Sequence, residues 1–204
     1  MKLYYATGTC SLGPRIVAHE LGIELESQKV DIKKHQTDSG SDYWHINPKG
    51  YVPALMTDDG YLLTEGVAIM QYLADRGSPT NLNAERGASS FYQLQEWLTF
   101  ISTELHKMFS PWLFHPEYGS EAQRVAMQKI YERFEVIDAH LKDQQYLVDD
   151  QFSLADVYLF TIVRWAGLFN IELTSYRNLS GFLERISNRS AVKSAMLAEG
   201  IIAN

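Results

Sequence analysis

The chain has 204 residues, of which 46% are hydrophobic and 21% charged, a balance typical of globular proteins of one large or two modest domains. Its net charge of −7 argues against nucleic acid and anionic membranes as partners. The single cysteine excludes an intrachain disulfide and favours a reducing compartment, so we predict a cytoplasmic protein.

Strand and helix signals alternate in the first 78 residues. A helix between the first two strands requires them to be parallel, and a turn signal at residues 58–60 joins the last two as an antiparallel hairpin. We therefore predict an α/β domain with a mixed four-stranded sheet. The pattern places strands at residues 2–6, 25–30, 54–57 and 61–64, helices after Cys10 and from Glu65, and a loop with a short helix at 33–46.

The strand signals stop after a polar segment, residues 79–87, which we interpret as a linker between domain 1–78 and domain 88–204. Helical patterns cover residues 88–115 and 121–141, and two more helices are expected within 175–199. The second domain is therefore predicted to be an all-α helical bundle.

One helix of this bundle has a clear start signal. Ser153 and Asp156 have the spacing of a capping box, and the helix that follows is apolar nearly all round. Such a helix belongs in the centre of a bundle. Charges at Asp156 and Arg164 interrupt the apolar segment 152–171, so we predict no membrane span.

Two residues beside the predicted hairpin suggest a binding site. A cis bond before Pro53 would turn the backbone of Val52 outward, where its N–H and C=O can pair with an extended peptide. Glu65 stands at a helix start, where N–H groups gather. The alternative interpretation is that Pro53 only begins an edge strand and Glu65 only caps a helix.

Cys10 lies between a strand and a helix. A thiol at a helix N-terminus is more easily ionised, although a lone cysteine is more often an inert buried residue. Because no second cysteine exists, any redox chemistry at Cys10 requires an external thiol.

A polar line runs along the predicted helix 88–115. Thr99, Thr103, His106 and Ser110 recur at helical spacing beside the apolar stripe, so they face either a cleft or solvent. The histidines show no metal-ligand spacing with cysteine or carboxylates, and we predict no metal.

Together these motifs resemble a known family. The Cys-bearing loop, Val52-Pro53 before a hairpin and Glu65 at a helix start resemble a thioredoxin-like domain. Followed by an all-α domain with a Ser-x-x-Asp capping box, the whole chain resembles a cytosolic glutathione transferase. Cys10 with His106 resembles the bacterial beta class.

The resemblance implies roles for residues of the first domain. Val52, before a cis Pro53, would pair with the cysteinyl part of glutathione, and Glu65 with the N–H of Gly66 would hold the γ-glutamyl end. Gly66 stands where most relatives have serine or threonine. His35 lies where beta-class relatives often carry a lysine for the glycyl carboxylate, so both substitutions weaken the expected contacts.

In the second domain, the resemblance implies that Thr99 and Thr103 reach glutathione across a homodimer, and that His106 and Lys107 belong to the active site. Thr99 replaces an asparagine common in relatives.

The implied function is conjugation of glutathione, as co-substrate, to hydrophobic electrophiles, with Cys10 and His106 as the catalytic residues. The helical domain would contribute the electrophile pocket, for which the aromatic candidates are Phe109, Trp112 and Trp165. Two alternatives remain on the residues alone: a glutathione-dependent disulfide or peroxide reductase acting through Cys10, and a non-catalytic ligand-binding protein of the same fold.

Overall fold

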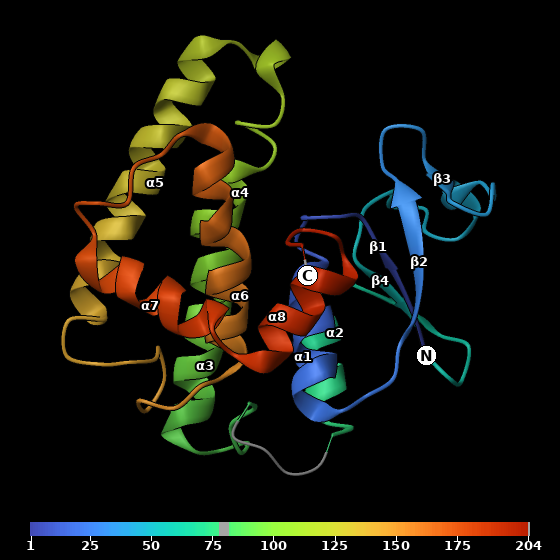
Figure 1. Ribbon diagram of the computed structural model, residues 1–204, viewed down its shortest axis with the longest axis horizontal. Coiled ribbons are helices and arrows are strands. Elements are labelled where there is room, and N and C mark those ends of the chain that lie inside the picture. Colours follow the sequence, from blue (N-terminus) through green and yellow to red (C-terminus); the bar gives the residue numbers. More distant parts are fainter. Residues whose placement is uncertain (78–81, 204) are drawn as a thin grey trace. The chain divides into compact units, whose positions relative to one another are not determined.

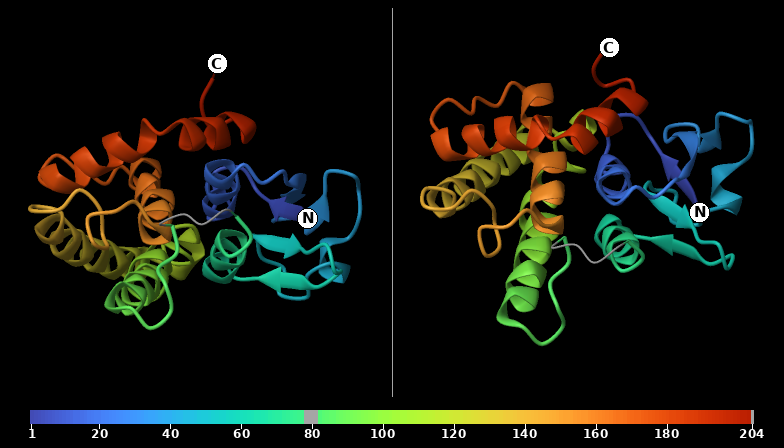
Figure 2. Two further views of the ribbon diagram at one scale, coloured as in Figure 1. Left: turned by 90° about the horizontal axis from the view of Figure 1, so that it is seen from below. Right: turned by 60° about the horizontal axis from the view of Figure 1, so that its bottom comes forward.

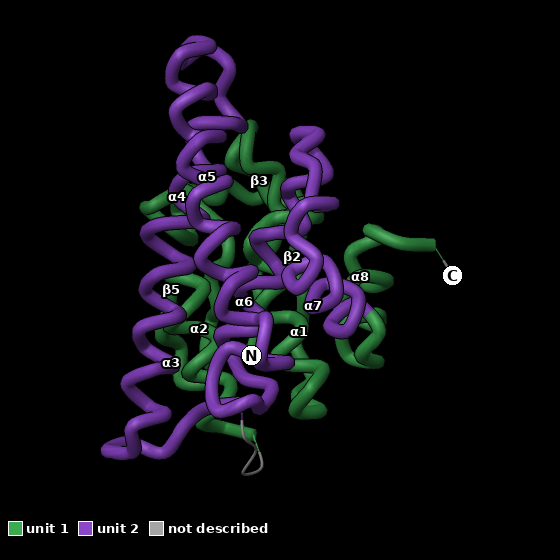
Figure 3. Tube along the Cα trace, turned by 90° about the vertical axis from the view of Figure 1, so that its left-hand side faces the viewer, with its two compact units in different colours: residues 1–80, 188–204 green, residues 81–187 purple. Residues whose placement is uncertain are grey.

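The computed structural model describes residues 1–77 and 82–203, which form two compact units (Figure 3). Unit 1 is Met1–Thr80 together with Asn188–Asn204, and unit 2 is Asn81–Ser187. The first residues of the predicted linker, 79–81, lie outside the described residues.

Unit 1 contains a mixed sheet with the strand order β3-β2-β1-β4-β5 in the described part of the chain (Figure 1). The first strand pairs with β2 in parallel and with β4 antiparallel, and β4 and β5 form the predicted hairpin. The sheet therefore has one strand more than predicted, because the two-residue β3 adds to the edge at β2. The strands are β1 (Lys2–Tyr5), β2 (Glu26–Asp31), β3 (Gln36–Thr37), β4 (Ala54–Met56) and β5 (Leu62–Thr64).

Side chains alternate between the two faces of the sheet, and both faces are buried at the central strands β1 and β4. Helices α1 (Leu12–Leu21) and α2 (Gly66–Ala74) cover one face (Figure 2). On the other face, Tyr4 and Tyr43 belong to a second cluster, in which Tyr43 comes from the 3₁₀ helix Tyr43–His45. The predicted short helix in residues 33–46 is thus confirmed.

The C-terminal helix α8 (Ser190–Ala198) belongs to unit 1, in contrast to the prediction that the helical domain continues to residue 204. It packs along α1 (Figure 1), and two ion pairs join these segments. Arg189 contacts Glu20 at 2.7 Å, and Arg15 contacts Glu199 at 3.2 Å. Helical periodicity marks such a segment as amphipathic but contains no information about which partner it packs against.

Unit 2 is all-α, as predicted, and both α3 and α7 pack against α6. Its α-helices are α3 (Ser89–Phe100), the short α4 (Lys107–Phe109), α5 (Ser120–His140), α6 (Leu154–Val163) and α7 (Arg177–Ser187). The two helices expected within 175–199 are α7 and α8, one in each unit.

Helix α6 is buried along its whole length, and its capping box forms as predicted. The Ser153 N–H and hydroxyl both donate to Asp156 Oδ2 at 2.8 Å, and the Leu147 N–H donates to Oδ1 at 2.9 Å. Burial raises the pKa of Asp156 to about 6. No helix in the part of the chain that the structure describes is long and apolar enough to cross a membrane.

The long helix predicted over residues 88–115 is correct in its first part and wrong in its last. It ends at Phe109, and the Ser110–Pro111 bond that follows is cis. Proline lacks an N–H and disfavours helical backbone in the residue before it, so Pro111 explains the early end. Within this stretch, the segment Ile101–His106 is a π-helix rather than an α-helix.

Candidate active site

Cys10 lies in the loop directly before α1, as the sequence predicts. Its half-buried thiol donates a hydrogen bond to the carbonyl oxygen of Val52, with an Sγ–O distance of 3.4 Å. This contact joins two predicted site residues that are 42 positions apart in the chain. The thiol therefore lies beside the backbone segment that was expected to bind a peptide.

Hydrogen bonds within the Cys10 loop and from the C-terminal segment stabilise the conformation of this loop. Ser11 is fully buried, and its hydroxyl donates to the carbonyl oxygen of Ala6 at 3.1 Å. From the C-terminal segment, Glu199 accepts the Gly8 N–H at 3.0 Å and the Arg15 Nε–H at 3.2 Å. A buried carboxylate that is bonded in this way fixes the loop backbone.

The Val52–Pro53 bond is cis, as predicted, and Pro53 lies against the start of α2. A Cβ atom added to Gly66 would lie 3.7 Å from the Pro53 ring, which is an ordinary van der Waals distance. Gly66 is the first residue of α2. The structure thus brings Cys10, Val52, Pro53 and Gly66 together.

Glu65 occupies the N-cap position of α2, but its side chain does not cap the helix. Its exposed carboxylate instead accepts a bond from Lys49 Nζ at 2.8 Å, and Lys49 also bonds the hydroxyl of Thr64 at 2.8 Å. The φ angle of Glu65 is 72°, a left-handed conformation that is strained for a residue with a Cβ. Strained residues of this kind cluster at ligand sites, which favours the binding interpretation of Glu65 over the capping one.

His35 is separately positioned by an aromatic neighbour. Its ring lies over Trp44 with the ring centroids 4.1 Å apart, and a Cβ on Gly50 would come within 2.6 Å of the Trp44 ring. Gly50 has a φ of 70°, so only glycine fits beside this ring pair. The His35 Nδ1 is buried and has no hydrogen-bond partner among the described residues.

In unit 2, His106 ends the π-helical segment and is half-buried. Its Nδ1 lies 2.8 Å from the hydroxyl of Tyr158 on α6, and its ring packs edge-on to Trp165 with centroids 5.1 Å apart. Short π-helical segments occur frequently at functional sites.

The other predicted residues of unit 2 lie at its surface. Thr99, Thr103 and Lys107 are exposed, and the Thr103 hydroxyl donates to the carbonyl of Thr99 at 3.0 Å. Of the aromatic candidates, Phe109 is fully buried and Trp165 is 3% exposed, so both are core residues, whereas Trp112 is 39% exposed.

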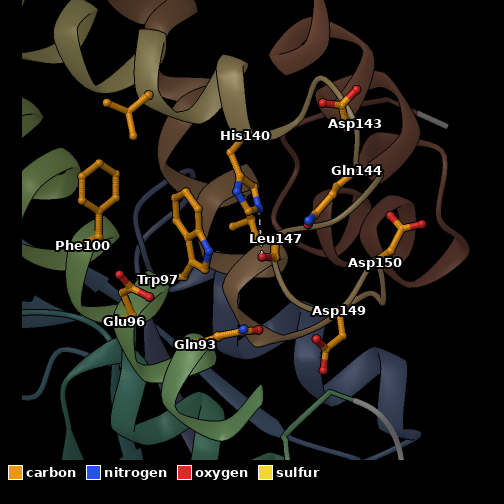
Figure 4. A pocket seen from close by; sticks show the side chains of 11 residues that line it. Gln93, Glu96, Trp97, Phe100, His140, Asp143, Gln144, Leu147, Asp149 and Asp150 are labelled. Carbon is orange, nitrogen blue, oxygen red and sulfur yellow. Dashed lines mark hydrogen bonds between the residues drawn. The ribbon is translucent and has the colours of Figure 1, made fainter. Parts of the chain in front are cut away.

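A separate pocket of about 520 Å³ lies within unit 2 (Figure 4). Trp97 and His140 form part of its wall with ring centroids 4.7 Å apart, and the His140 Nε2 lies 3.1 Å from the Leu147 carbonyl oxygen. None of the predicted site residues, all of which the structure describes, lines this pocket. Its four carboxylates belong to Glu96, Asp143, Asp149 and Asp150.

Comparisons with known proteins identify the family of this chain. The family model described as "Glutathione S-transferase, N-terminal domain" matches residues 1–75, and that described as "Glutathione S-transferase, C-terminal domain" matches residues 100–190. Glutathione S-transferase GstA of Escherichia coli O157:H7 is 41% identical over 201 residues, which cover 98% of this chain and 100% of the relative. The chain belongs to the glutathione S-transferase family.

Solved structures of glutathione S-transferases share the fold of the whole chain. The bacterial enzyme BphK, solved as a ternary complex, is 45% identical with a TM-score of 0.95, covering 98% of this chain and 100% of its own. The beta-class enzyme of Sphingomonas chungbukensis is 36% identical with a TM-score of 0.95, covering 99% and 100%. These findings confirm the predicted fold, family and glutathione transferase function, and they do not favour the two alternatives.

Two residues of this glutathione transferase that contact predicted site residues were missed by the sequence analysis. Lys49 pairs with Glu65, and Tyr158 pairs with His106. Lysine is common in polar segments and tyrosine is common in apolar helices. The local sequence therefore does not identify either residue as functional. In the described residues no three His, Cys, Asp or Glu side chains are grouped as a metal site.

Replacing Gly66 by serine is expected to tighten glutathione binding about fivefold, because one added hydroxyl hydrogen bond contributes about 1 kcal/mol. The new Cβ would meet Pro53 at 3.7 Å without a clash. Titration calorimetry with glutathione checks this, with Gly66→Ala as the control that adds the Cβ alone. Equal affinities of the serine and alanine variants would contradict the expected hydroxyl contact.

Proposed function

We propose that this chain conjugates glutathione to a hydrophobic electrophile, with Cys10 and His106 as the catalytic residues. The observation that carries the proposal is the 3.4 Å contact between the Cys10 thiol and the Val52 carbonyl. Val52 is the residue expected to pair with the cysteinyl part of glutathione, so the sulfur of that residue would be bound near Cys10 and the N-terminus of α1. A helix N-terminus favours a thiolate.

The remaining contacts of the tripeptide are proposed from the family resemblance. Glu65 and the N–H of Gly66 bind the γ-glutamyl end, and His35 meets the glycyl carboxylate. Thr99, Thr103 and Lys107 are further glutathione contacts. Their surface exposure keeps their polar groups accessible to a ligand.

The reaction needs an ionised glutathione sulfur. A free thiol has a pKa of about 8.5, so lowering it by two units requires about 2.7 kcal/mol of differential stabilisation. The helix N-terminus, Cys10 and His106 supply it together. The thiolate then forms a bond to the electrophilic carbon, and with an aromatic halide the halide ion leaves with the bonding electron pair.

Retention on immobilised glutathione, followed by a conjugation assay with a generic aromatic halide, tests this function. We expect retention, elution by free glutathione, and product formation that is lost in His106→Ala. Retention without conjugation of any electrophile would instead indicate a non-catalytic binding protein.

We further propose a cytoplasmic homodimer. The exposed residues Thr99, Thr103 and Lys107 are most useful if a second subunit completes the site, and the reduced single cysteine fits a reducing compartment. Sedimentation at micromolar concentration should give a dimer. A fully active monomer would contradict this assembly.

A further inference from the structure

His106 and Tyr158 form a pair that the established family function does not explain. The phenol oxygen lies 2.8 Å from His106 Nδ1, and Tyr158 is only 4% exposed. Such a distance is a short, well-formed hydrogen bond. Because a neutral imidazole has one donor and one acceptor nitrogen, this bond determines which nitrogen carries the proton.

The position of the Tyr158 hydroxyl is fixed by its helix. Every residue of α6 is buried, and the capping box of Ser153 and Asp156 holds the start of this helix. The His106 ring is also held from the side, since Trp165 packs edge-on to it at 5.1 Å. Packing on both partners therefore favours the observed geometry of this bond.

A phenol is a better hydrogen-bond donor than acceptor, because its oxygen lone pair is delocalised into the ring. The favoured arrangement is thus Tyr158 O–H donating to Nδ1. The neutral imidazole then carries its proton on Nε2, which makes this nitrogen a donor rather than a base.

We propose that Tyr158 is a positioning residue that holds His106 as the neutral Nε2–H tautomer, so that His106 stabilises the glutathione thiolate as a hydrogen-bond donor and does not act as its general base. The proposal rests on the proposed catalytic role of His106. It assigns a function to a core tyrosine. It also distinguishes hydrogen-bond donation by His106 from general-base catalysis by His106, because a His106→Ala variant would impair both mechanisms.

The tautomer is measurable in the intact wild-type protein. Nitrogen-15 NMR of the imidazole at neutral pH, with His106 assigned by comparison with His106→Ala, should show Nε2 protonated and Nδ1 as the acceptor. A protonated Nδ1 with an unprotonated Nε2 would overturn the proposal.

A conservative variant tests the catalytic consequence. Tyr158→Phe removes only the hydroxyl, and we expect mixed tautomers at His106 and a fall in kcat of about 3- to 10-fold, the effect of losing one neutral hydrogen bond. The KM for glutathione should change less than twofold, because losing the hydroxyl affects the stability of the thiolate more than it affects the binding of glutathione in the ground state. Tyr176→Phe, which removes the weaker 3.5 Å bond to the Tyr131 carbonyl, is the matched control and should leave both constants unchanged.

The outcomes distinguish this proposal from the one on which it rests. An unchanged tautomer and kcat in Tyr158→Phe would refute the positioning role. Undiminished conjugation by His106→Ala would refute the catalytic role of His106, whatever the tautomer measured.

Discussion

Replacing Glu65 by glutamine is expected to weaken glutathione binding about 10- to 150-fold, because a hydrogen bond to a charged group contributes about 1.5–3 kcal/mol. The variant keeps the shape of the side chain and removes its charge. Since the carboxylate is exposed and its only effect on α2 would be electrostatic, the fold should persist. Lys49 keeps its hydrogen bond to the Thr64 hydroxyl, and its side chain is 54% exposed, so the loss of its charged partner leaves no buried charge.

Calorimetry of glutathione binding measures this loss, and a melting curve checks the fold. Glu26→Gln is the matched control, because Glu26 is another exposed carboxylate of unit 1 paired with a lysine, Lys2, at 2.7 Å. Wild-type affinity in a folded Glu65→Gln protein would remove Glu65 from the binding site.

Replacing Asp156 by alanine is expected to lower the free energy of unfolding by about 3–5 kcal/mol near pH 5, since several buried donors lose their acceptor together. The Leu147 N–H, the Ser153 N–H and the Ser153 hydroxyl all donate to this carboxyl group. The alanine also leaves a cavity beside α6, the most buried helix of unit 2.

Denaturant unfolding measures the loss. Ser153→Ala is the control with a smaller expected effect, because a lost helix cap lowers the free energy of unfolding by about 1 kcal/mol. Equal midpoints for the wild type and Asp156→Ala would show that the buried bonds of Asp156 do not stabilise the fold.

The same residue makes a testable contribution to the pH dependence of stability. Burial raises the pKa of Asp156 to about 6, whereas an aspartate in an unfolded chain titrates near 3.9. Between these values the folded protein binds more protons at this position, so the contribution of Asp156 to the free energy of unfolding is full below about 3.9 and falls as the pH rises to about 6. The advantage of the wild type over Asp156→Asn, which cannot titrate, should therefore shrink by about 2–3 kcal/mol across this window. An advantage that grows with pH would contradict the raised pKa.

The parts of the fold that could be predicted have local causes. The capping box at Ser153 and Asp156 and the turn at Gly60 each depend on neighbouring residues, and the structure confirms them. The cis bond before Pro53 was also predictable, because only proline allows it readily.

The parts that were missed depend on contacts between distant segments. Helix α8 joins unit 1 through Glu199 and Arg189, and nothing in its periodicity identifies α1 as its partner. The early end of the helix at Phe109 has a local cause in Pro111, although the helical spacing on both sides of this proline predicts a longer helix. The π-helical segment before it has no simple sequence signature.

For the candidate site, residue types were predictable but their pairing was not. Cys10 and Glu65 stood out as chemical groups at helix starts. Lys49 and Tyr158 become visible only when the fold places them beside Glu65 and His106. A lysine paired with a carboxylate and a tyrosine bonded to an imidazole are defined by distance in space and not along the chain.

The central claim is that this protein lowers the pKa of the glutathione thiol, and the pKa of the bound thiol tests it most directly. Ultraviolet difference spectra of the protein with and without saturating glutathione, recorded across a pH series, follow the thiolate absorbance. S-methylglutathione, which has no ionisable thiol, corrects for absorbance changes of the protein itself. We predict a bound-thiol pKa about two units below the free value of about 8.5. A bound thiol that ionises at or above the free value would contradict the claim.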